Sequence, residues 1–364
     1  MKTSRITILL FLVTSIFVLS LAVPGWLKTG AQAADNPKQA KDPLSPGSAA
    51  SRPAGKTDPR RGKPFTDPNK VCPMPDDWLK QPIKYESWAN GADLAVTIDQ
   101  QIYTAILPIV MEFGKKNGIK IAVEEGTCGT SAGAVQRKTV DVSAMCCPPG
   151  DIDRLPGLRY HTIGISSLAL FVNKANTIKN VSTSDVRNLF GGKTRKWSEL
   201  KIPGGQAAPN VEVKPVVRLH CKSRPGHWCL ILANESLFSK NALEVGSIID
   251  MLNQTASLRG AIGYETLWMI EHYGMKDKLN VLNVDGYSPY DHGSVISGKY
   301  SLYRTMNLTS WDAPGIAKPQ AKKLVEYILS NLDRIDKSLE IIPAPLLKKA
   351  GWQFTGDELT GEPF

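Results

Sequence analysis

From residue 92 onward, short apolar runs alternate with stretches in which apolar residues recur every three or four positions. The runs Leu94–Ile98, Ile119–Val123 and Val140–Ala144 predict strands, and Gln101–Lys116 predicts a helix whose apolar side chains share one face. Pro108 inside that stretch predicts a kinked helix. Strands that alternate with amphipathic helices form mostly parallel sheets flanked by helices. The pattern therefore predicts an α/β fold.

The second half of the chain continues the same alternation. The strands expected there are Leu168–Asn173, Val213–Arg218, Ala261–Tyr264, Val281–Val284 and Tyr300–Met306. The further helices expected are Ala132–Lys138, Asp185–Phe190, Trp228–Phe238 and Ala317–Ile335. Ser182, Thr183 and Ser184 offer N-cap oxygens to the helix at 185, and Gly191 and Gly192 end it. With 364 residues, the chain is long enough for two lobes.

The first 33 residues carry the pattern of a secretory signal peptide. Lys2 and Arg5 precede an apolar run over Ile6–Val23, and Ala31 and Ala33 form a small-residue cleavage site. The apolar run is almost long enough to be a membrane anchor instead. The cleavage site favours removal, so we expect a soluble, periplasmic product in an oxidising compartment.

Residues 34–70 are rich in Pro, Ala, Gly, Ser, Lys and Arg and contain almost no large apolar side chains. Such a composition cannot bury enough surface to offset its ordering entropy, which predicts a disordered basic tether. An alternative role for it is to engage an acidic partner surface. Residues 71–91 contain Trp78, Tyr85 and Trp88 and are expected to pack as an arm against the body.

The charge distribution limits the possible partners. Most of the formal net charge of +10 lies in the first 90 residues, so the body carries only a mild positive excess. Neither a basic stripe nor interleaved aromatic residues are present, so we expect no nucleic-acid partner. The mild excess suits an anionic solute, or it is ordinary surface charge.

Small polar residues collect where the predicted strands end. The loop Gly126–Ala134 is made of Gly, Thr, Ser, Ala and Cys and leads into a helix, whose unpaired N–H groups favour anions. Cys146 ends the third predicted strand before a turn at Pro148–Gly150, and Arg218 ends an apolar strand. Ligands of parallel sheets bind beyond the carboxyl ends of the strands. These loops are therefore expected to face one cleft.

Six pieces in this order resemble the phosphate-type substrate-binding proteins of bacterial ABC transporters. The pieces are Leu94–Asp99, Gly126–Ala134 with Thr139–Asp141, Leu168–Asn173 with Val186–Trp197, Val216–Arg218, Gly260–Tyr264 and Gly298–Arg304. The resemblance implies a two-lobed type II periplasmic binding protein fold, with residues 92–165 plus 285–350 as lobe 1, 166–284 as lobe 2, and 351–364 as a tail. It implies a monomer that is not an enzyme, closes over a small inorganic anion and passes it to an ABC transporter permease.

The resemblance also implies ligand contacts. Matched to the motifs of the family, they are Thr97, Ile98, Cys128, Thr130, Ser131, Cys146, Arg218 and Ser223. Arg218 would clamp two oxygens of the anion, or else it forms a structural ion pair. The sequence departs from the family at three places: Cys146 replaces an Asp, Cys128 a Ser and Cys221 a Gly. Without that Asp, selectivity for phosphate over related oxyanions is left open.

The six cysteines allow two interpretations. In an exported protein we expect disulfides: Cys221 with Cys229, Cys128 with Cys146 or Cys147, and a bridge from Cys72 that holds the arm. The alternative is a metal-binding or redox protein on the same scaffold, with copper or zinc as cofactor. Its ligands would come from Cys128, Cys146, Cys147, His220, Cys221, His227 and Cys229. The first hypothesis needs no cofactor.

Overall fold

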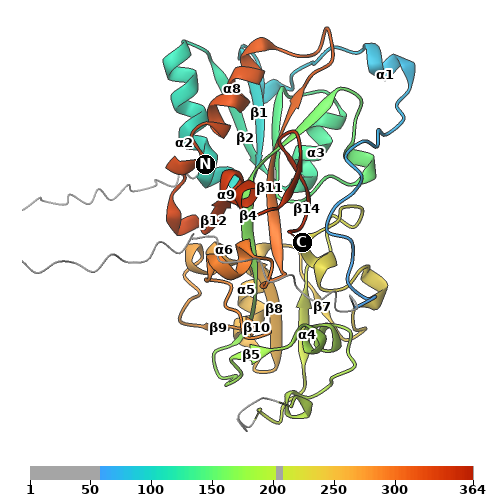
Figure 1. Cartoon of the computed structure of the whole chain (residues 1–364), viewed down its shortest axis with the longest axis vertical. Helices are drawn as coiled ribbons and strands as arrows, with labels where there is room; N and C mark the ends of the chain where they lie inside the picture. The colour runs from blue at the N-terminus through green and yellow to red at the C-terminus, as the bar shows by residue number, and fades with distance from the viewer. Residues whose placement is uncertain (1–57, 202–207, 364) are drawn as a thin grey trace, which may run out of the picture. The chain divides into compact units, whose positions relative to one another are not determined.

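One long strand, β4 (Leu158–Asn173), runs through the middle of the main sheet (Figure 1). The computed structural model describes residues 58–201 and 208–363, so the predicted signal peptide lies outside the described residues. Residues Leu158–Ser167 of β4 pair with β11 (Tyr303–Trp311), and Leu168–Val172 pair with β8 (Ala261–Thr266). β4 therefore joins two halves of the sheet, which we call the first and second lobes.

The first lobe has the strand order β2-β1-β3-β11-β4. Its strands β1 (Leu94–Asp99), β2 (Ile121–Gly126) and β3 (Val142–Met145) pair in parallel, and β11 is antiparallel to β3 and to β4. Its helices are α2 (Gln100–Asn117), α3 (Cys128–Gln136), α8 (Pro319–Leu329) and α9 (Ala344–Lys349). Helix α2 contacts both β2 and α8.

The second lobe continues the sheet as β8-β6-β7. Strand β6 (Lys214–Val217) is parallel to β8 and to β7 (Leu243–Glu244), whereas β9 (Leu279–Val281) is antiparallel to β4. Its helices are α4 (Thr183–Phe190), α5 (Ile248–Ser257) and α6 (Leu267–His272), and β5 (Asn180–Val181) pairs with β10 (Asn283–Val284). The remaining elements are α1 (Asp76–Lys80), α7 (His292–Ile296), β12 (Ile341–Pro343), β13 (Gln353–Thr355) and β14 (Glu358–Gly361).

Capping residues fix where the long helices begin and end. Asp99 caps α2 by accepting a hydrogen bond from the backbone N–H of Gln101, and Gly118 ends α2 in the left-handed conformation that glycine adopts without strain. The carboxylate and hydroxyl of Asp185 and Ser182 form the capping box that begins α4. Pro108 lies inside α2 as predicted. Local sequence therefore sets these boundaries.

The predicted α/β fold is confirmed, and strands β1, β2 and β3, which lead to the cavity described below, pair in parallel. Several boundaries are corrected. Helix α3 begins at Cys128 rather than Ala132, because Thr127 accepts a hydrogen bond from the N–H of Thr130 and caps it there. The strand predicted from Tyr300 is β11, which begins three residues later, at Tyr303. The helix predicted over Ala317–Ile335 is shorter, because α8 covers only Pro319–Leu329. The strand predicted over Val281–Val284 is divided between β9 and β10.

The predicted helix Trp228–Phe238 is wrong. The structure has two short 3₁₀ turns there, at His227–Leu230 and Glu235–Leu237. Backbone N–H and carbonyl groups that an α-helix would use internally form hydrogen bonds with a segment near the N-terminus instead. The N–H of Ala233 donates to Arg60, and the carbonyl of Cys229 accepts from Gly62, at 2.7 and 2.8 Å. Tertiary hydrogen bonds have replaced the local ones.

Residues 58–70, which we call the strap, correct the expectation of a disordered tether over 34–70; the rest of that stretch lies outside the described residues. The strap contacts both lobes. Arg60 binds Asn188 of α4 at 2.9 Å, and the hydroxyl of Thr66 donates to the carbonyl of Pro149 beyond β3 at 2.8 Å. In Figure 1 it is the start of the blue segment. Arginines and a few apolar contacts therefore order a segment whose composition predicted disorder.

The predicted arm and the predicted tail also pack against the rest of the protein. In the predicted arm, 71–91, the indole of Trp78 donates to the carbonyl of Gln136 and the ammonium of Lys138 lies over the Trp78 ring. The predicted tail, 351–364, contains the hairpin β13–β14, whose Glu358 forms a buried ion pair with Arg154. The lobe boundaries given above remain predictions. Within residues 58–201 and 208–363, no helix has both the length and the apolar character needed to cross a membrane.

Candidate functional site

A cavity of about 310 Å³ lies where the carboxyl ends of β1, β3 and β6 meet the buried middle of the sheet. Its walls come from both lobes. The lining residues are Asp99, Gln100, Gln101, Thr127, Cys128, Gly129, Cys146, Arg218, His220, Cys221, Arg224, Gly246, Ser247 and Arg304. Two larger hollows, of about 520 and 500 Å³, lie beside the strap and beside the β13–β14 hairpin. Of these three hollows in the described part of the chain, the cavity at the strand ends is the one that combines helix N-termini with buried arginines.

Three helices begin at this cavity. The lining residues Gln100 and Gln101 open α2, Cys128 and Gly129 open α3, and Ser247 is the N-cap of α5. The first N–H groups of a helix have no partner within it, and the helix dipole adds partial positive charge at that end. Three such ends at one cavity favour a negatively charged ligand.

Two guanidinium groups share one carboxylate in the cavity wall. Arg218 follows β6, Arg304 lies on β11, and both bind Glu265 of β8, whose Oε1 is 3.3 Å from Nη2 of Arg304. All three side chains are more than nine-tenths buried. Burial alone would raise the pKa of Glu265, but the two arginines hold it below its usual value. The trio therefore carries one net positive charge at neutral pH.

Other donors hold Glu265 in place, whereas the arginines keep donors to spare. The amide of Gln101 and the backbone N–H of Thr266 both donate to Oε1 of Glu265 at 2.9 Å. The Nε atoms of Arg218 and Arg304 are buried and have no hydrogen-bond partner among the described residues. An unsatisfied buried donor on a charged group is costly. The two arginines that line the cavity therefore keep unused hydrogen-bonding capacity.

The two histidines near the cavity are engaged by these arginines. Nδ1 of His220 lies 3.1 Å from the carbonyl oxygen of Arg218, to which it donates, so its Nε2 accepts from Nη1 of Arg218 at 3.3 Å. Nε2 of His227 accepts from Nη2 of Arg304. Burial and then the neighbouring arginines lower the pKa of both imidazoles. Both rings are therefore neutral, and their lone pairs are in use.

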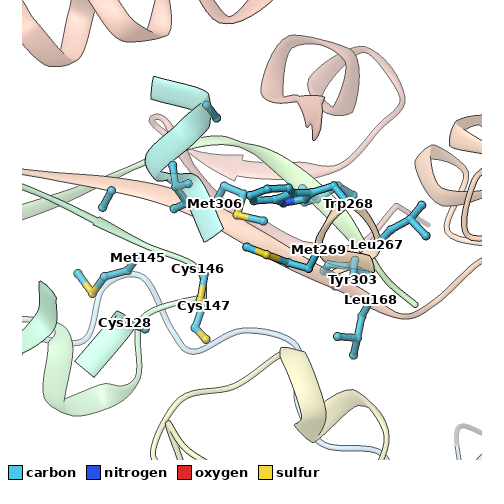
Figure 2. Packing of buried hydrophobic residues seen from close by; sticks show 14 of the residues in the cluster. Cys128, Met145, Cys146, Cys147, Leu168, Leu267, Trp268, Met269, Tyr303 and Met306 are labelled. Atoms are coloured by element: carbon cyan, nitrogen blue, oxygen red, sulfur yellow. The ribbon is translucent and has the colours of Figure 1, made fainter. Parts of the chain in front are cut away.

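Three buried thiols form a cluster, and two of its members, Cys128 and Cys146, line the cavity. The sulfur atoms of Cys128, Cys146 and Cys147 all lie within 4.8 Å of one another, and Figure 2 shows the consecutive Cys146 and Cys147 beyond Met145. Nη1 of Arg304 donates to the sulfur of Cys146 at 2.9 Å. The neighbouring thiols of Cys128 and Cys147, together with Arg304, lower the pKa of Cys146. Cys146 is therefore the negatively charged partner of Arg304 in a buried contact.

The structure brings Cys128, Cys146 and Arg218 to the cavity as predicted, but not the other five residues. Thr97 and Ile98 are fully buried within β1, which runs on to Asp99, so Asp99 takes the place predicted for them. Thr130 and Ser131 belong to the first turn of α3, which begins earlier than predicted, and Thr127 and Gly129 line the cavity instead. Ser223 is exposed and lines the hollow beside the strap.

Sequence reasoning missed Arg304 and Glu265. Arg304 lies on a predicted strand, and Glu265 lies one residue beyond the predicted strand Ala261–Tyr264, inside the longer observed β8. A charged residue inside a fully buried strand needs a partner of opposite charge. That signal was available, but it could not say which buried charge pairs with which.

No disulfide joins the cysteines of the described region, and all six are free thiols. Cys229 turns away from Cys221 and donates to the carbonyl of Arg224 at 3.4 Å. Cys72 holds the arm through its backbone N–H, which donates to the carbonyl of Arg154 at 2.7 Å. None of the predicted bridges is therefore formed: those of Cys221 with Cys229, of Cys128 with Cys146 or Cys147, and of Cys72.

The chain was compared with known proteins. A family model described as a PBP superfamily domain matches residues 84–331. The phosphate-binding protein PstS of Bacillus subtilis (strain 168) is 26% identical over 272 residues, which covers 70% of this chain and 80% of that protein. These matches span both lobes and the cavity.

Two solved structures share the fold. One is an ABC-type phosphate transport receptor from Vibrio cholerae, with a TM-score of 0.52 and 14% identity over 71% of this chain and 98% of that one. The other is a putative phosphate ABC transporter substrate-binding protein with bound phosphate from Clostridium perfringens, with a TM-score of 0.53 and 17% identity over 69% and 99%. The two-lobed fold predicted from the sequence is therefore confirmed.

Proposed function

The chain belongs to the PBP superfamily, and from this premise we propose that it is a solute-binding receptor that captures a small oxyanion in the cavity between its lobes. The receptor is not an enzyme. The oxyanion is phosphate or a relative of similar shape. The named relatives bind or transport phosphate, which supports this choice and favours solute binding over a metal or redox protein.

One observation carries the proposal. Arg218 and Arg304 are buried at the cavity, share the single carboxylate of Glu265, and keep their Nε donors without partners in the described part of the chain. A tetrahedral oxyanion offers several acceptor oxygens and can bind both guanidinium groups at once. The N-termini of α2, α3 and α5 add further donors. Both the positive charge of the cavity and its hydrogen-bond donors therefore favour an anionic ligand.

The partner and the location follow from the same class of protein. We infer that the protein is exported by the signal peptide predicted in residues 1–33 and delivers its anion to an ABC transporter permease. The monomeric state remains a prediction. The lobes would open and close about the point where β4 passes from β11 to β8, near Ser167.

Calorimetric titration of the ligand-free protein tests the proposal. Phosphate, sulfate, arsenate, molybdate and tungstate are titrated in turn, and we expect at least one to bind. Arg218→Met should weaken that binding by at least about tenfold, because it removes a charge-assisted donor pair. Arg159→Met is the matched control, since Arg159 forms only an exposed pair with Asp312. No binding of any of the five anions would refute the proposal.

A further inference from the structure

The sulfur atoms in the cavity wall have no role in the proposed anion site. We propose that Cys128, Cys146, Cys147 and Cys221 together bind one thiophilic metal ion, Zn²⁺ or Cu⁺, as a resident part of the protein. The ion is not the transported solute, and the inference goes beyond the proposed function and does not depend on it. It concerns four thiols that come from three separate loops.

The first argument is the geometry of the sulfurs. The sulfurs of Cys128, Cys146 and Cys147 lie within 4.8 Å of one another, and Cys221 lines the same cavity as Cys128 and Cys146. A Zn–S bond is about 2.3 Å, which places the sulfurs of a tetrahedral site about 3.8 Å apart. The thiols are therefore close to ligand spacing, and small side-chain rotations would complete the site.

The second argument is the way the sulfurs converge. The sulfur of Cys128 lies within 4.8 Å of two other sulfurs, those of Cys146 and Cys147, and Cys221 lines the same cavity as Cys128. A disulfide uses one partner for each sulfur. Adjacent residues have Cα atoms 3.8 Å apart, below the usual range for a disulfide, so Cys146 and Cys147 are poorly placed to bond each other. A shared ion satisfies all four sulfurs together.

The third argument is that the structure selects these four from the wider set of sulfur and imidazole groups. The Nε2 atoms of His220 and His227 accept hydrogen bonds from Arg218 and Arg304, so their lone pairs are not available to a metal ion. Cys229 donates to the carbonyl of Arg224, away from the cluster. Four sulfurs without nitrogen ligands are the donor set that suits Zn²⁺ or Cu⁺.

The surroundings suit a negatively charged cluster. Four thiolates around Zn²⁺ carry a net charge of about −2. Nη1 of Arg304 contacts the sulfur of Cys146, and the guanidinium of Arg224 lines the same cavity. Buried thiolates need such positive partners, because an unpaired buried charge is costly.

The loop that carries Cys221 is held beside the loop that carries Cys147. Nε and Nη2 of Arg224 bind the two carboxylate oxygens of Asp153 at 2.7 and 2.6 Å, in a buried bidentate pair. Cys221 itself has φ of 58°, a left-handed conformation that is uncommon for a residue with a side chain. Cys221 follows β6, whereas Cys128 follows β2 and the other two cysteines follow β3.

Metal analysis of the full chain tests the inference. The protein is purified anaerobically without chelator, and we expect about one zinc or copper per chain, with elemental analysis identifying the ion. After removal of the metal, titration with Co²⁺ should give the visible bands of tetrahedral thiolate coordination. Cys221→Ser should weaken Zn²⁺ or Co²⁺ binding by at least about tenfold, the scale seen even for residues that only support ligands.

Cys229→Ser is the matched control, because Cys229 lies in the same loop but outside the cluster, and its metal content should not change. Cys221 is partly exposed, so its serine variant should fold; circular dichroism checks this. Isolation of disulfide-linked peptides containing Cys128 or Cys221, or four free thiols that bind no Zn²⁺, would overturn the inference. Anion binding without metal would leave the proposed function standing, and metal without anion binding would refute that function alone.

Discussion

Nη1 of Arg304 lies 2.9 Å from the sulfur of Cys146, so an arginine on β11 connects the positive and the sulfur-lined walls of the cavity. Arg304 also binds Glu265 and His227, and its side chain is fully buried. The stability of the protein and the charge of the cavity therefore depend on the same residues. The predictions below separate these two effects.

Arg304→Gln should lower the free energy of unfolding by about 3–5 kcal/mol, because it removes one partner of a buried ion pair and leaves Glu265 less compensated. Urea unfolding measures the change. Arg159→Gln is the control, and breaking its exposed pair with Asp312 should cost less than about 1 kcal/mol. Equal losses in the two variants would contradict the role assigned to Arg304.

Glu265→Gln should change stability and anion affinity in opposite directions. It leaves two buried guanidinium groups without their carboxylate, so the free energy of unfolding should fall. The same change leaves one more positive charge at the cavity, which should tighten anion binding by about tenfold. Calorimetric titration of folded protein measures the affinity. Weaker or unchanged binding would show that the anion does not sit beside this trio.

His227→Asn should make the free energy of unfolding depend less on pH in the acidic range. Burial, and then Arg304, hold the pKa of His227 well below its usual value. As pH falls below about 6.5, the unfolded chain takes up a proton that the folded chain resists, so the wild type loses stability there. Asn does not titrate, and it tolerates the left-handed backbone at this position, where φ is 52°. Urea unfolding from pH 8 to about 5 compares the two slopes, and identical slopes would rule out this role for His227.

Gly62→Ala should release the strap. A Cβ on Gly62 would lie 2.7 Å from the carbonyl oxygen of Cys229, so the backbone must move and the hydrogen bond between them is lost. Trypsin should then cleave faster at Arg60 and Arg61, since released segments are preferred sites of proteolysis. Gly246→Ala is the control, because its Cβ would meet no atom within 4 Å. A strap that stays resistant in Gly62→Ala would mean that its side-chain contacts suffice.

Much of the fold could be predicted because it depends on local signals. The apolar periodicity of α2 and the capping residues around α4 are written within single turns of the chain, and the structure matches both. The segment Trp228–Phe238 failed because its backbone partners, Arg60 and Gly62, lie more than 160 residues away in the sequence. The prediction of disorder for strap residues 58–70 was wrong for the same reason, since their composition does not reveal the distant surface to which they bind.

The α/β alternation, the loops at the strand ends and the presence of Cys128, Cys146 and Arg218 there could be read from local sequence, because periodicity and capping act over a few residues. Which charges face the cavity depends on how the strands pair in the folded sheet. Glu265 and Arg304 meet because β8 and β11 both pair with β4, and the cysteines meet because three loops end at one place. Electrostatic and metal-ligand interactions depend on distances in space, and those distances are set by the sheet as a whole.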